Sequence, residues 1–330
     1  MKQAFERDIS VVVPLYNEEE SLRELCAWIA QVMDEHGYSY EVLLVDDGSK
    51  DRSWRVAQEL AELNPSIRGV RFNRNYGKSA ALQTGFDYAR GAVVITMDAD
   101  LQDSPDEIPE LYRLIKDEGY DLISGWKKTR HDPLSKTIPS KLFNFVTRKI
   151  SGIQLHDFNC GLKAYRGDVV KTLDIYGEMH RYIPMLAKRN GYDRIGEKVV
   201  QHQARKYGTT KFGIGRIFGF LDLVSIAFVT KFKKRPMRFF GALGTFSFLF
   251  GLVVTLWLIG EKIYKSSQHL YVREVTEQPL FFLALVAVMV GVQLFLAGFL
   301  AEMLTLESSR KNDYLIAETV NEPTAVSDLN

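Results

Sequence analysis

The sequence is poor in cysteine and carries almost no net charge. Only Cys26 and Cys160 occur among 330 residues, which excludes a disulfide framework and a cysteine-rich metal site and favours a reducing compartment. A formal charge of +1 gives no basis for binding nucleic acid or another polyanion over the whole surface. The first ten residues lack an apolar core of signal-peptide length, and we therefore expect no cleaved targeting segment.

Charge is also missing from two long apolar runs near the C-terminus. Residues 239–260 and 280–301 are each 22 residues long and contain no charged residue. At about 1.5 Å per residue, a helix of that length reaches about 33 Å, enough to cross the hydrocarbon core of a bilayer. A buried core helix is seldom this long and uncharged. The pattern predicts two transmembrane helices.

Basic residues before the first run set the expected orientation. The cluster consists of Lys231, Lys233, Lys234, Arg235 and Arg238. The loop between the runs has fewer Lys and Arg, so the N-terminal part and the tail should both face the cytoplasm, as in a multi-pass protein of the cytoplasmic membrane. Residues 212–238 mix apolar and charged positions, which favours amphipathic juxtamembrane helices in contact with membrane lipids, although the same residues could pack as core.

Residues 1–211 read as one cytoplasmic α/β domain, and residues 302–330 as a cytoplasmic tail. Within the domain, short runs rich in Val, Ile and Leu alternate with segments whose apolar residues recur at helical spacing. This order predicts a mostly parallel sheet between helix layers, as in Rossmann-like folds. The expected strands are 9–14, 40–45, 67–72, 92–97 and 121–124, and the expected helices are 21–33, 53–63, 78–89 and 108–116.

Acidic residues follow several of the expected strands. Asp46 and Asp47 come after the second strand, Asp98 and Asp100 after the fourth, and Glu18 after the first. Ligands of such sheets bind beyond the carboxyl ends of the strands, so these carboxylates could face a common crevice. Each segment alone is weak evidence, because Asp-Gly is a common turn pair and Asp after a strand often caps the next helix.

The stretch "VVITMDADLQD" at 93–103 carries the strongest chemical signal. Its carboxylates adjoin a buried strand, and burying them without a cationic partner would cost several kcal/mol. Mg²⁺ and Mn²⁺ take oxygen ligands and complete their shell from substrate phosphates. Asp98 and Asp100 can share one ion if the chain stays extended, with the Gln102 amide oxygen as a third ligand. No Walker or dinucleotide-binding fingerprint is present.

The motifs together resemble those of a known enzyme family. "VVVPLYNEEES", "LLVDDGSKD", "NRNYGKSAALQTGF", "MDADLQD", "HDFNCGLKAYR" and "RKYGTTKF" are similar, in order and spacing over residues 8 to about 215, to those of family 2 glycosyltransferases with the GT-A fold. The resemblance is to the branch with dolichyl-phosphate mannose synthase and the bacterial polyisoprenyl-phosphate glycosyltransferases. The undecaprenyl-phosphate transferases of that branch share the two C-terminal spans.

The resemblance implies roles for particular residues. Lys127 stands where relatives often have Arg, which puts its contact with the donor diphosphate in question. Asp157 would lie nearest the acceptor, where it could orient, cap or act as a base. By family pattern, the nucleoside pocket would be lined by Pro14, Tyr16, Glu18 and Asp46. The ribose, diphosphate and metal would lie at Asp98, Ala99 and Asp100, with Gln102 as a further metal ligand. The basic pair near the donor diphosphate and the acceptor phosphate would be Arg205 and Lys211.

The implied reaction is transfer of one sugar from a nucleotide sugar to a polyprenyl phosphate, with inversion at the anomeric carbon. The acceptor phosphate is largely dianionic at pH 7, so a strong general base is dispensable. UDP-glucose is the expected donor, with UDP-formamidoarabinose and GDP-mannose as alternatives. We expect a homo-oligomer, a dimer or a tetramer, for which Gly241, Gly244 and Gly251 could allow close helix contacts.

Three other classes of protein fit the sequence less well. A processive polysaccharide synthase of this family usually adds a "QxxRW" segment, which is absent here. A non-catalytic membrane adaptor with the same fold would be expected to lose the acidic site, whereas every carboxylate is present. A channel or transporter would need polar residues inside its spans, and Gln293 is nearly alone there.

Overall fold

The computed structural model describes residues 5–128, 144–145, 147–149, 151–177, 179–203, 206, 236–269, 273–307 and 316–320. The chain forms two compact units. One is Met1–Leu223 together with Asn312–Asn330, and the other is Val224–Lys311. The expected amphipathic segment lies, up to residue 235, outside the described residues.

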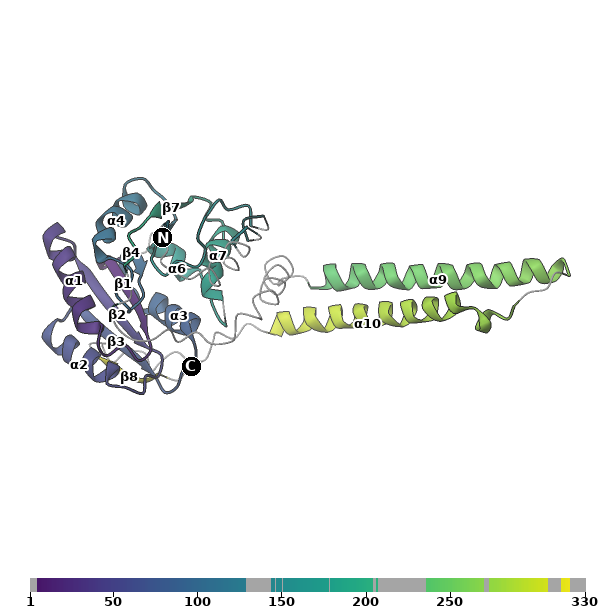
Figure 1. Ribbon diagram of the computed structural model, residues 1–330, viewed down its shortest axis with the longest axis horizontal. Coiled ribbons are helices and arrows are strands. Elements are labelled where there is room, and N and C mark those ends of the chain that lie inside the picture. Colours follow the sequence, from purple (N-terminus) through teal and green to yellow (C-terminus); the bar gives the residue numbers. More distant parts are fainter. Residues whose placement is uncertain are drawn as a thin grey trace. The chain divides into compact units, whose positions relative to one another are not determined.

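The described part of the first unit contains an eight-stranded sheet with the order β7-β5-β6-β4-β1-β2-β3-β8 (Figure 1). Neighbours pair in parallel from β4 through β1 and β2 to β3, and also between β5 and β7, whereas β6 and β8 are antiparallel to their neighbours. The strands are β1 Arg7–Leu15, β2 Tyr40–Asp46, β3 Ile67–Phe72, β4 Gly91–Thr96, β5 Leu122–Trp126, β6 Lys163–Arg166, β7 Ile195–Val199 and β8 Ile316–Val320.

Helices cover both faces of this sheet, because successive side chains of a strand point to opposite faces. Val11 and Val13 of β1 pack in one core cluster with α1 Leu22–His36, α2 Ser53–Leu63 and α4 Ile108–Lys116. Val12 packs on the opposite face. The helices on that face are α3 Lys78–Tyr88, α6 Gly167–Lys171 and α7 Ile183–Arg189.

The predicted strands and helices of the first 124 residues are all confirmed, with ends within three residues of those expected. Three strands were not expected. The four-residue strand β6 inserts antiparallel between β4 and β5. The strand β7 pairs in parallel with β5 at the end of the sheet. The third is β8, in the tail, to which the sequence pattern assigned no element. It pairs antiparallel with β3 at the edge of the sheet.

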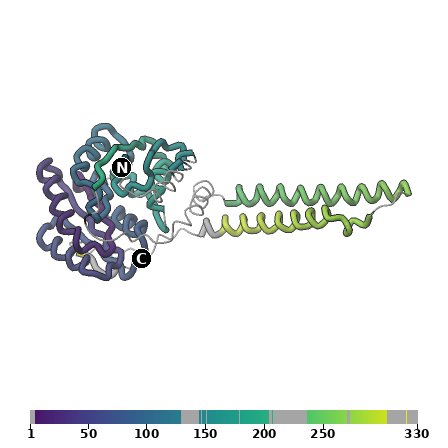
Figure 2. Tube along the Cα trace, in the orientation of Figure 1, coloured from purple at the N-terminus to yellow at the C-terminus, as the bar shows by residue number. Residues whose placement is uncertain are grey.

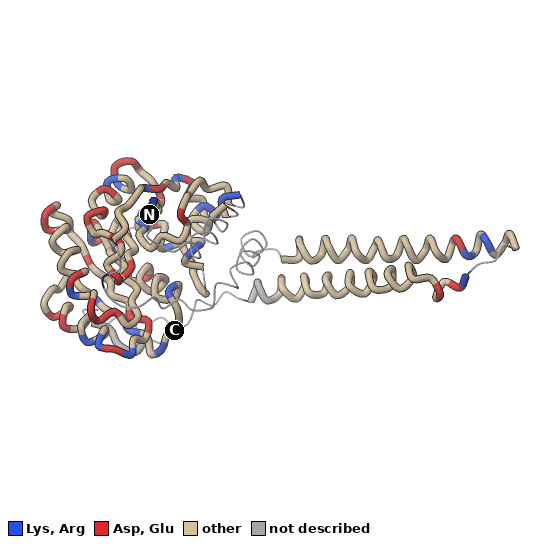
Figure 3. The backbone as a smooth tube through the Cα atoms, in the orientation of Figure 1, with Lys and Arg blue, Asp and Glu red and all other residues tan. Residues whose placement is uncertain are grey.

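The second unit contains two helices that are long and apolar enough to cross a membrane, α9 Met237–Ser267 and α10 Pro279–Glu307. Only 17% and 11% of their most apolar stretches are buried, which is not the environment of core helices in a soluble protein. Figure 2 shows them running side by side, and Figure 3 shows charged residues at their connection, where the sequence has several between Glu261 and Glu277.

Glycines let α9 and α10 approach closely. A Cβ at Gly244 would lie 2.6 Å from the Gly291 carbonyl oxygen, and one at Gly251 would lie 2.5 Å from that of Ala284. Ser247 Oγ adds a hydrogen bond of 2.8 Å to the Ala287 carbonyl. These small residues therefore serve the contact between two helices of one chain. In the described structure Gly244 and Gly251 face the neighbouring helix of the same chain, and their expected use between subunits, like the homo-oligomer, stays a prediction.

Candidate active site

The carboxyl ends of β1, β2 and β4 meet at one edge of the sheet, as parallel neighbours must. Pro14 lies near the end of β1, opposite Val45 in β2. Asp46 is the last residue of β2, and Asp98 follows β4 by two positions. The edge expected to bind ligands therefore collects the predicted residues from separate segments of the chain.

Lysines surround Asp98. Its Oδ1 lies 2.5 Å from Nζ of Lys78, the first residue of α3. Burial opposes ionisation, but Lys78, Lys127 and Lys163 outweigh it and lower the pKa of Asp98 to about 2. A carboxylate with this pKa is fully ionised at neutral pH and sits in a position that already accommodates a cation.

Asp103 has a partner of its own. Its fully buried carboxylate lies 2.7 Å from Nζ of Lys127, which is mostly buried too. Burial opposes the charge of Lys127, but Asp103 outweighs it and raises the lysine pKa. The sequence alone showed no cationic partner for this cluster, and the structure corrects that interpretation, because the two lysines neutralise Asp98 and Asp103. Lys127 thus contacts Asp103, and its expected role at the donor diphosphate stays a prediction.

The chain already turns at Ala99 and Asp100, so it does not stay extended between the two carboxylates as the sequence argument assumed. Leu101 has a left-handed φ of 60°, and Asp100 Oδ1 accepts a hydrogen bond of 3.2 Å from the Gln102 amide nitrogen. The Gln102 carbonyl accepts one of 2.9 Å from Gln203. In the described part of the chain, no group of three or more His, Cys, Asp or Glu side chains could hold a metal ion. Asp98, Asp100 and Gln102 offer only oxygen ligands, which fit Mg²⁺ or Mn²⁺ completed by substrate phosphates.

The predicted motif around Asp157 folds over Asp98. Thr96 Oγ1 donates a hydrogen bond of 2.8 Å to the Gly161 carbonyl, and a Cβ at Gly161 would lie 2.5 Å from Asp98 Oδ2. Lys163, buried in β6, donates from Nζ to the Cys160 carbonyl. Gly161 is thus required for the close approach between this turn and the carboxylate.

Replacing Gly161 with alanine should lower turnover roughly a hundredfold, because the added Cβ has to displace the Asp98 carboxylate by about 1 Å. Steady-state rates with a nucleotide sugar measure this effect. Gly191→Ala is the matched control, since a Cβ there would meet no atom within 4 Å, although its φ of 96° carries backbone strain of its own. Equal rates for Gly161→Ala and the wild type would contradict the proposed place of Asp98.

The predicted nucleoside residues lie at the ends of β1 and β2 and in the loop after β1, which is tied to the loop after β2. The Asn17 amide donates to Ser49 Oγ and the Glu18 amide to Ser53 Oγ, each at 2.8 Å. Asp46 is fully buried, which raises its pKa, and its Oδ1 accepts a hydrogen bond of 2.9 Å from the Ser49 amide. The partly exposed side chains of Pro14, Tyr16 and Glu18 lie beside these contacts along the chain.

The neighbouring Asp47 has a structural role. Its carboxylate accepts hydrogen bonds from the amides of Tyr76 at 2.6 Å and Gly77 at 3.0 Å, just before α3 begins. Burial raises the pKa of Asp47 to about 6. Turn chemistry was the simpler explanation for this aspartate, and the structure confirms it.

Asp157 is almost fully buried, and its Oδ1 accepts a hydrogen bond of 3.0 Å from the Asn159 amide. This geometry fits capping or orienting better than proton abstraction. The neighbouring His156 stacks on the ring of Trp126, with the ring centroids 4.1 Å apart, and its Nδ1 contacts Glu197. Arg205 and Lys211 lie outside the described residues.

Lys78 and Lys163 are the site residues that sequence reasoning missed. A signal for Lys78 existed, because a lysine in the first turn of a helix has the wrong sign for the helix dipole and needs another reason to be there. Next to it, Ser79 Oγ lies 3.1 Å from Nδ1 of His180, and the His180 amide donates to the same oxygen at 3.0 Å. Lys163 gave no comparable signal, since its strand was not predicted.

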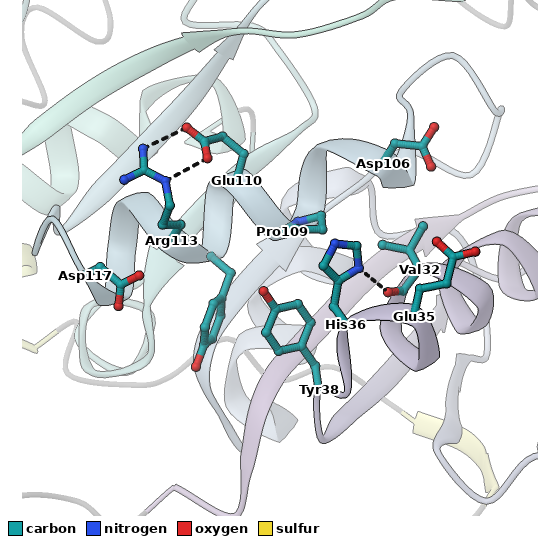
Figure 4. Close-up of a pocket in the computed structure, with 10 residues that line it drawn as sticks. Val32, Glu35, His36, Tyr38, Asp106, Pro109, Glu110, Arg113 and Asp117 are labelled. Carbon is teal, nitrogen blue, oxygen red and sulfur yellow. Dashed lines mark hydrogen bonds and ion pairs between the residues drawn. The ribbon is translucent and has the colours of Figure 1, made fainter.

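A separate cavity of about 610 Å³ lies between α1 and α4 (Figure 4). Its walls include His36 at the end of α1, Tyr38 just after it, and Glu110 and Arg113 of α4, which form an ion pair. None of the predicted site residues lines it.

Three comparisons place the chain among known proteins. Residues 10–174 match the family model for glycosyl transferase family 2. Dodecaprenyl-phosphate galacturonate synthase of Rhizobium johnstonii is 37% identical over 301 residues, which cover 90% of this chain and 87% of that protein. Undecaprenyl-phosphate 4-deoxy-4-formamido-L-arabinose transferase of Pseudomonas aeruginosa is 38% identical over 254 residues, which cover 76% of this chain and 73% of that protein.

The fold also has a counterpart among solved structures. Glucosyl-3-phosphoglycerate synthase from Mycobacterium tuberculosis, in complex with UDP, superposes with a TM-score of 0.53 at 23% identity and covers 67% of this chain and 80% of that chain. At this identity the similarity establishes the fold alone. The predicted α/β fold of the GT-A type, with two apolar helices after it, is confirmed.

Proposed function

Because the chain belongs to glycosyl transferase family 2, we propose that it transfers a single sugar from a nucleotide sugar to a polyprenyl phosphate, with inversion at the anomeric carbon. The observation that carries this proposal is the ionised Asp98, which lies at the carboxyl edge of the sheet among lysines. The two helices that could cross a membrane fit an acceptor that cannot leave the bilayer. Relatives named for polyprenyl-phosphate sugar transfer span most of the chain.

In this proposal Asp98, Asp100 and Gln102 hold the divalent cation. A divalent cation held by these residues would supply Lewis-acid stabilisation for the leaving diphosphate. Asp46 and the tied loops after β1 and β2 receive the nucleoside. Lys78 and the buried Lys163 place amino groups beside the position proposed for the diphosphate, where positive charge would stabilise the leaving group.

The nucleophile is the phosphate group of the acceptor itself. A phosphate monoester is largely dianionic at neutral pH, so the site needs to orient it and offset its repulsion from the donor, not to deprotonate it. Arg205 and Lys211 are the residues proposed for that task, and the buried Asp157 is proposed to hold the loop that faces the acceptor.

The sugar is a separate question from the acceptor. The relatives carry galacturonate and formamido-arabinose in their names, so the formamidoarabinose alternative fits them and the expected glucose stays a prediction. We propose a panel of radiolabelled nucleotide sugars, including galacturonate, formamidoarabinose, glucose and mannose donors, each incubated with the purified chain and a polyprenyl phosphate. One donor should label the organic extract with one sugar per lipid. No labelled lipid with any donor, or chains of several sugars, would contradict the proposed reaction.

The topology proposal places the catalytic unit and the tail on the cytoplasmic side. The basic cluster before α9 supports it. The strand β8 supports it independently, because residues 316–320 follow both apolar helices and yet pair with β3 of the catalytic unit. For β8 to pair with β3, the chain must cross the membrane an even number of times between the two strands.

Cysteine labelling in intact cells should therefore mark the loop between α9 and α10 alone. On a background without Cys26 and Cys160, single cysteines at Lys50, Gln268 and Ser327 report on the catalytic unit, the loop and the tail. A membrane-impermeant maleimide is expected to label position 268 only, and all three after lysis. Labelling of position 50 or 327 in intact cells, with 268 protected, would reverse the proposed topology.

A further inference from the structure

We propose that the β3 edge of the sheet is a docking surface for the chain's own C-terminal strand, and that this docking completes the donor pocket. The occupant is β8, residues 316–320. The link to the donor rests on the function proposed above, whereas the docking itself does not.

The docking surface is shaped for β8. Gly69 of β3 lies opposite Val320, and a Cβ at Gly69 would come within 2.7 Å of the Val320 side chain. The same Cβ would come within 3.1 Å of the Trp54 ring, so Val320 and Trp54 together cover the glycine. Val320 packs against the main core cluster of the sheet. A side chain at position 69 would push the strand away.

Without β8, the strand β3 would be an open edge. Its backbone N–H and C=O groups on that side would lack the partners that the antiparallel pairing provides. Open edges fray and recruit foreign strands, and a strand of the same chain is the simplest protection. Pairing with β8 thus stabilises β3 itself.

Arg71 connects β3 to the proposed donor pocket. In the sheet register, Arg71 is opposite Asp46 on one side and Glu318 on the other. Its Nε lies 3.5 Å from Asp46 Oδ2, and its Nη2 donates a hydrogen bond of 3.4 Å to the Ser49 carbonyl. Asp46 and Ser49 are the buried residues of the loop proposed to receive the nucleoside. A frayed β3 would loosen the arginine that holds this loop.

Docking also depends on how the chain enters the membrane. Residues 316–320 follow both apolar helices and can reach β3 only when the tail lies on the side of the catalytic unit. The enzyme would therefore bind its donor fully only after α9 and α10 have both inserted. Donor affinity becomes a consequence of correct membrane insertion.

Two truncated chains isolate the contribution of β8. One ends at Val320 and the other at Leu315, so both lack residues 321–330 and they differ only in the strand. Each is purified in detergent beside the full chain. We expect hydrogen exchange of residues 67–72 to rise at least tenfold when β8 is missing, and the KM for the nucleotide sugar to rise roughly five- to twentyfold, with kcat changed less than threefold. The chain ending at Val320 should match the full chain in both measurements.

Each outcome has a distinct meaning. Equal exchange of residues 67–72 in the two truncated chains would overturn the docking. Faster exchange with an unchanged KM would overturn the link to the donor pocket while leaving the docking in place. Absence of transfer by the full chain with any nucleotide sugar would instead defeat the proposed function, and the exchange measurement would still test the docking.

A cysteine pair separates docking within one chain from docking onto a second copy. Cysteines at Arg71 and Glu318 are directly opposed in the register, and the two native cysteines are buried. Oxidation should give an intrachain disulfide, with monomers on a non-reducing gel. A disulfide-linked dimer would overturn the assignment of β8 to its own chain, and no disulfide at all would overturn the register.

Discussion

Asparagine at both Asp98 and Asp100 should lower sugar transfer about a thousandfold or more, even with saturating Mg²⁺ or Mn²⁺. Both substitutions keep the size of the side chains and remove the two negative charges proposed to hold the cation. Without it, the diphosphate leaves without a Lewis acid, and a loss of several kcal/mol of transition-state stabilisation corresponds to that factor. Lys78 would also lose the carboxylate to which it is bound. The measurement is lipid-linked product formed per minute at several metal concentrations.

A nearby exposed carboxylate provides the control. Asp106 lies three residues beyond Asp103 in the chain and accepts a hydrogen bond of 2.8 Å from Trp28 Nε1, away from the lysines. Asp106→Asn should leave transfer within about twofold of the wild type. Undiminished turnover of the double variant, or full activity of the wild type in excess chelator, would rule out the metal assignment.

Local patterns in the sequence sufficed for the regular part of the fold. The strands from β1 to β5 and the helices from α1 to α4 follow from apolar periodicity, because each buries one face or one stripe against its neighbours. The apolar runs within α9 and α10 were visible from the absence of charge alone. These signals lie within single segments, and no knowledge of distant contacts is needed to see them.

The unexpected strands depend on distant partners. β6 has four residues, too few for periodicity to identify, and it exists because β4 and β5 leave a place between them. β8 exists because β3 offers an open edge more than 240 residues earlier in the chain. Sequence pattern cannot reveal such pairings, since each strand is stabilised mainly by contacts with the other.

The candidate site shows the same division. Asp98 was identified because its carboxylate adjoins a buried strand, and its place at the sheet edge follows from topology. The sequence could not distinguish the roles of the adjacent Asp46 and Asp47. The structure shows that the Asp46 carboxylate contacts Ser49 and Arg71, whereas Asp47 accepts hydrogen bonds from the turn before α3. The lysines that neutralise Asp98 and Asp103 come from other elements, so their partners were invisible in the sequence.

Lys78 should prove to compete with the metal for Asp98, so that replacing it with glutamine strengthens metal binding while weakening catalysis. Its ammonium lies 2.5 Å from the carboxylate that is proposed to hold the cation. A metal ion must displace this ammonium, and at the start of α3 the displaced charge remains beside the position proposed for the diphosphate. Lys78 would then neutralise the Asp98 carboxylate before the metal binds and the leaving diphosphate after the metal binds.

Two measurements test this competition between Lys78 and the metal ion for Asp98. Mn²⁺ binding to the nucleotide-free Lys78→Gln protein, followed by electron paramagnetic resonance, should be about three- to tenfold tighter than for the wild type, whereas kcat/KM for transfer should fall roughly ten- to a hundredfold. Lys116→Gln is the matched control, because this exposed lysine ends α4, where its charge suits the helix dipole, and it should alter neither value. Weaker Mn²⁺ binding together with lost activity would mean that Lys78 only supports the fold of the site, and unchanged values of both would remove it from the active site.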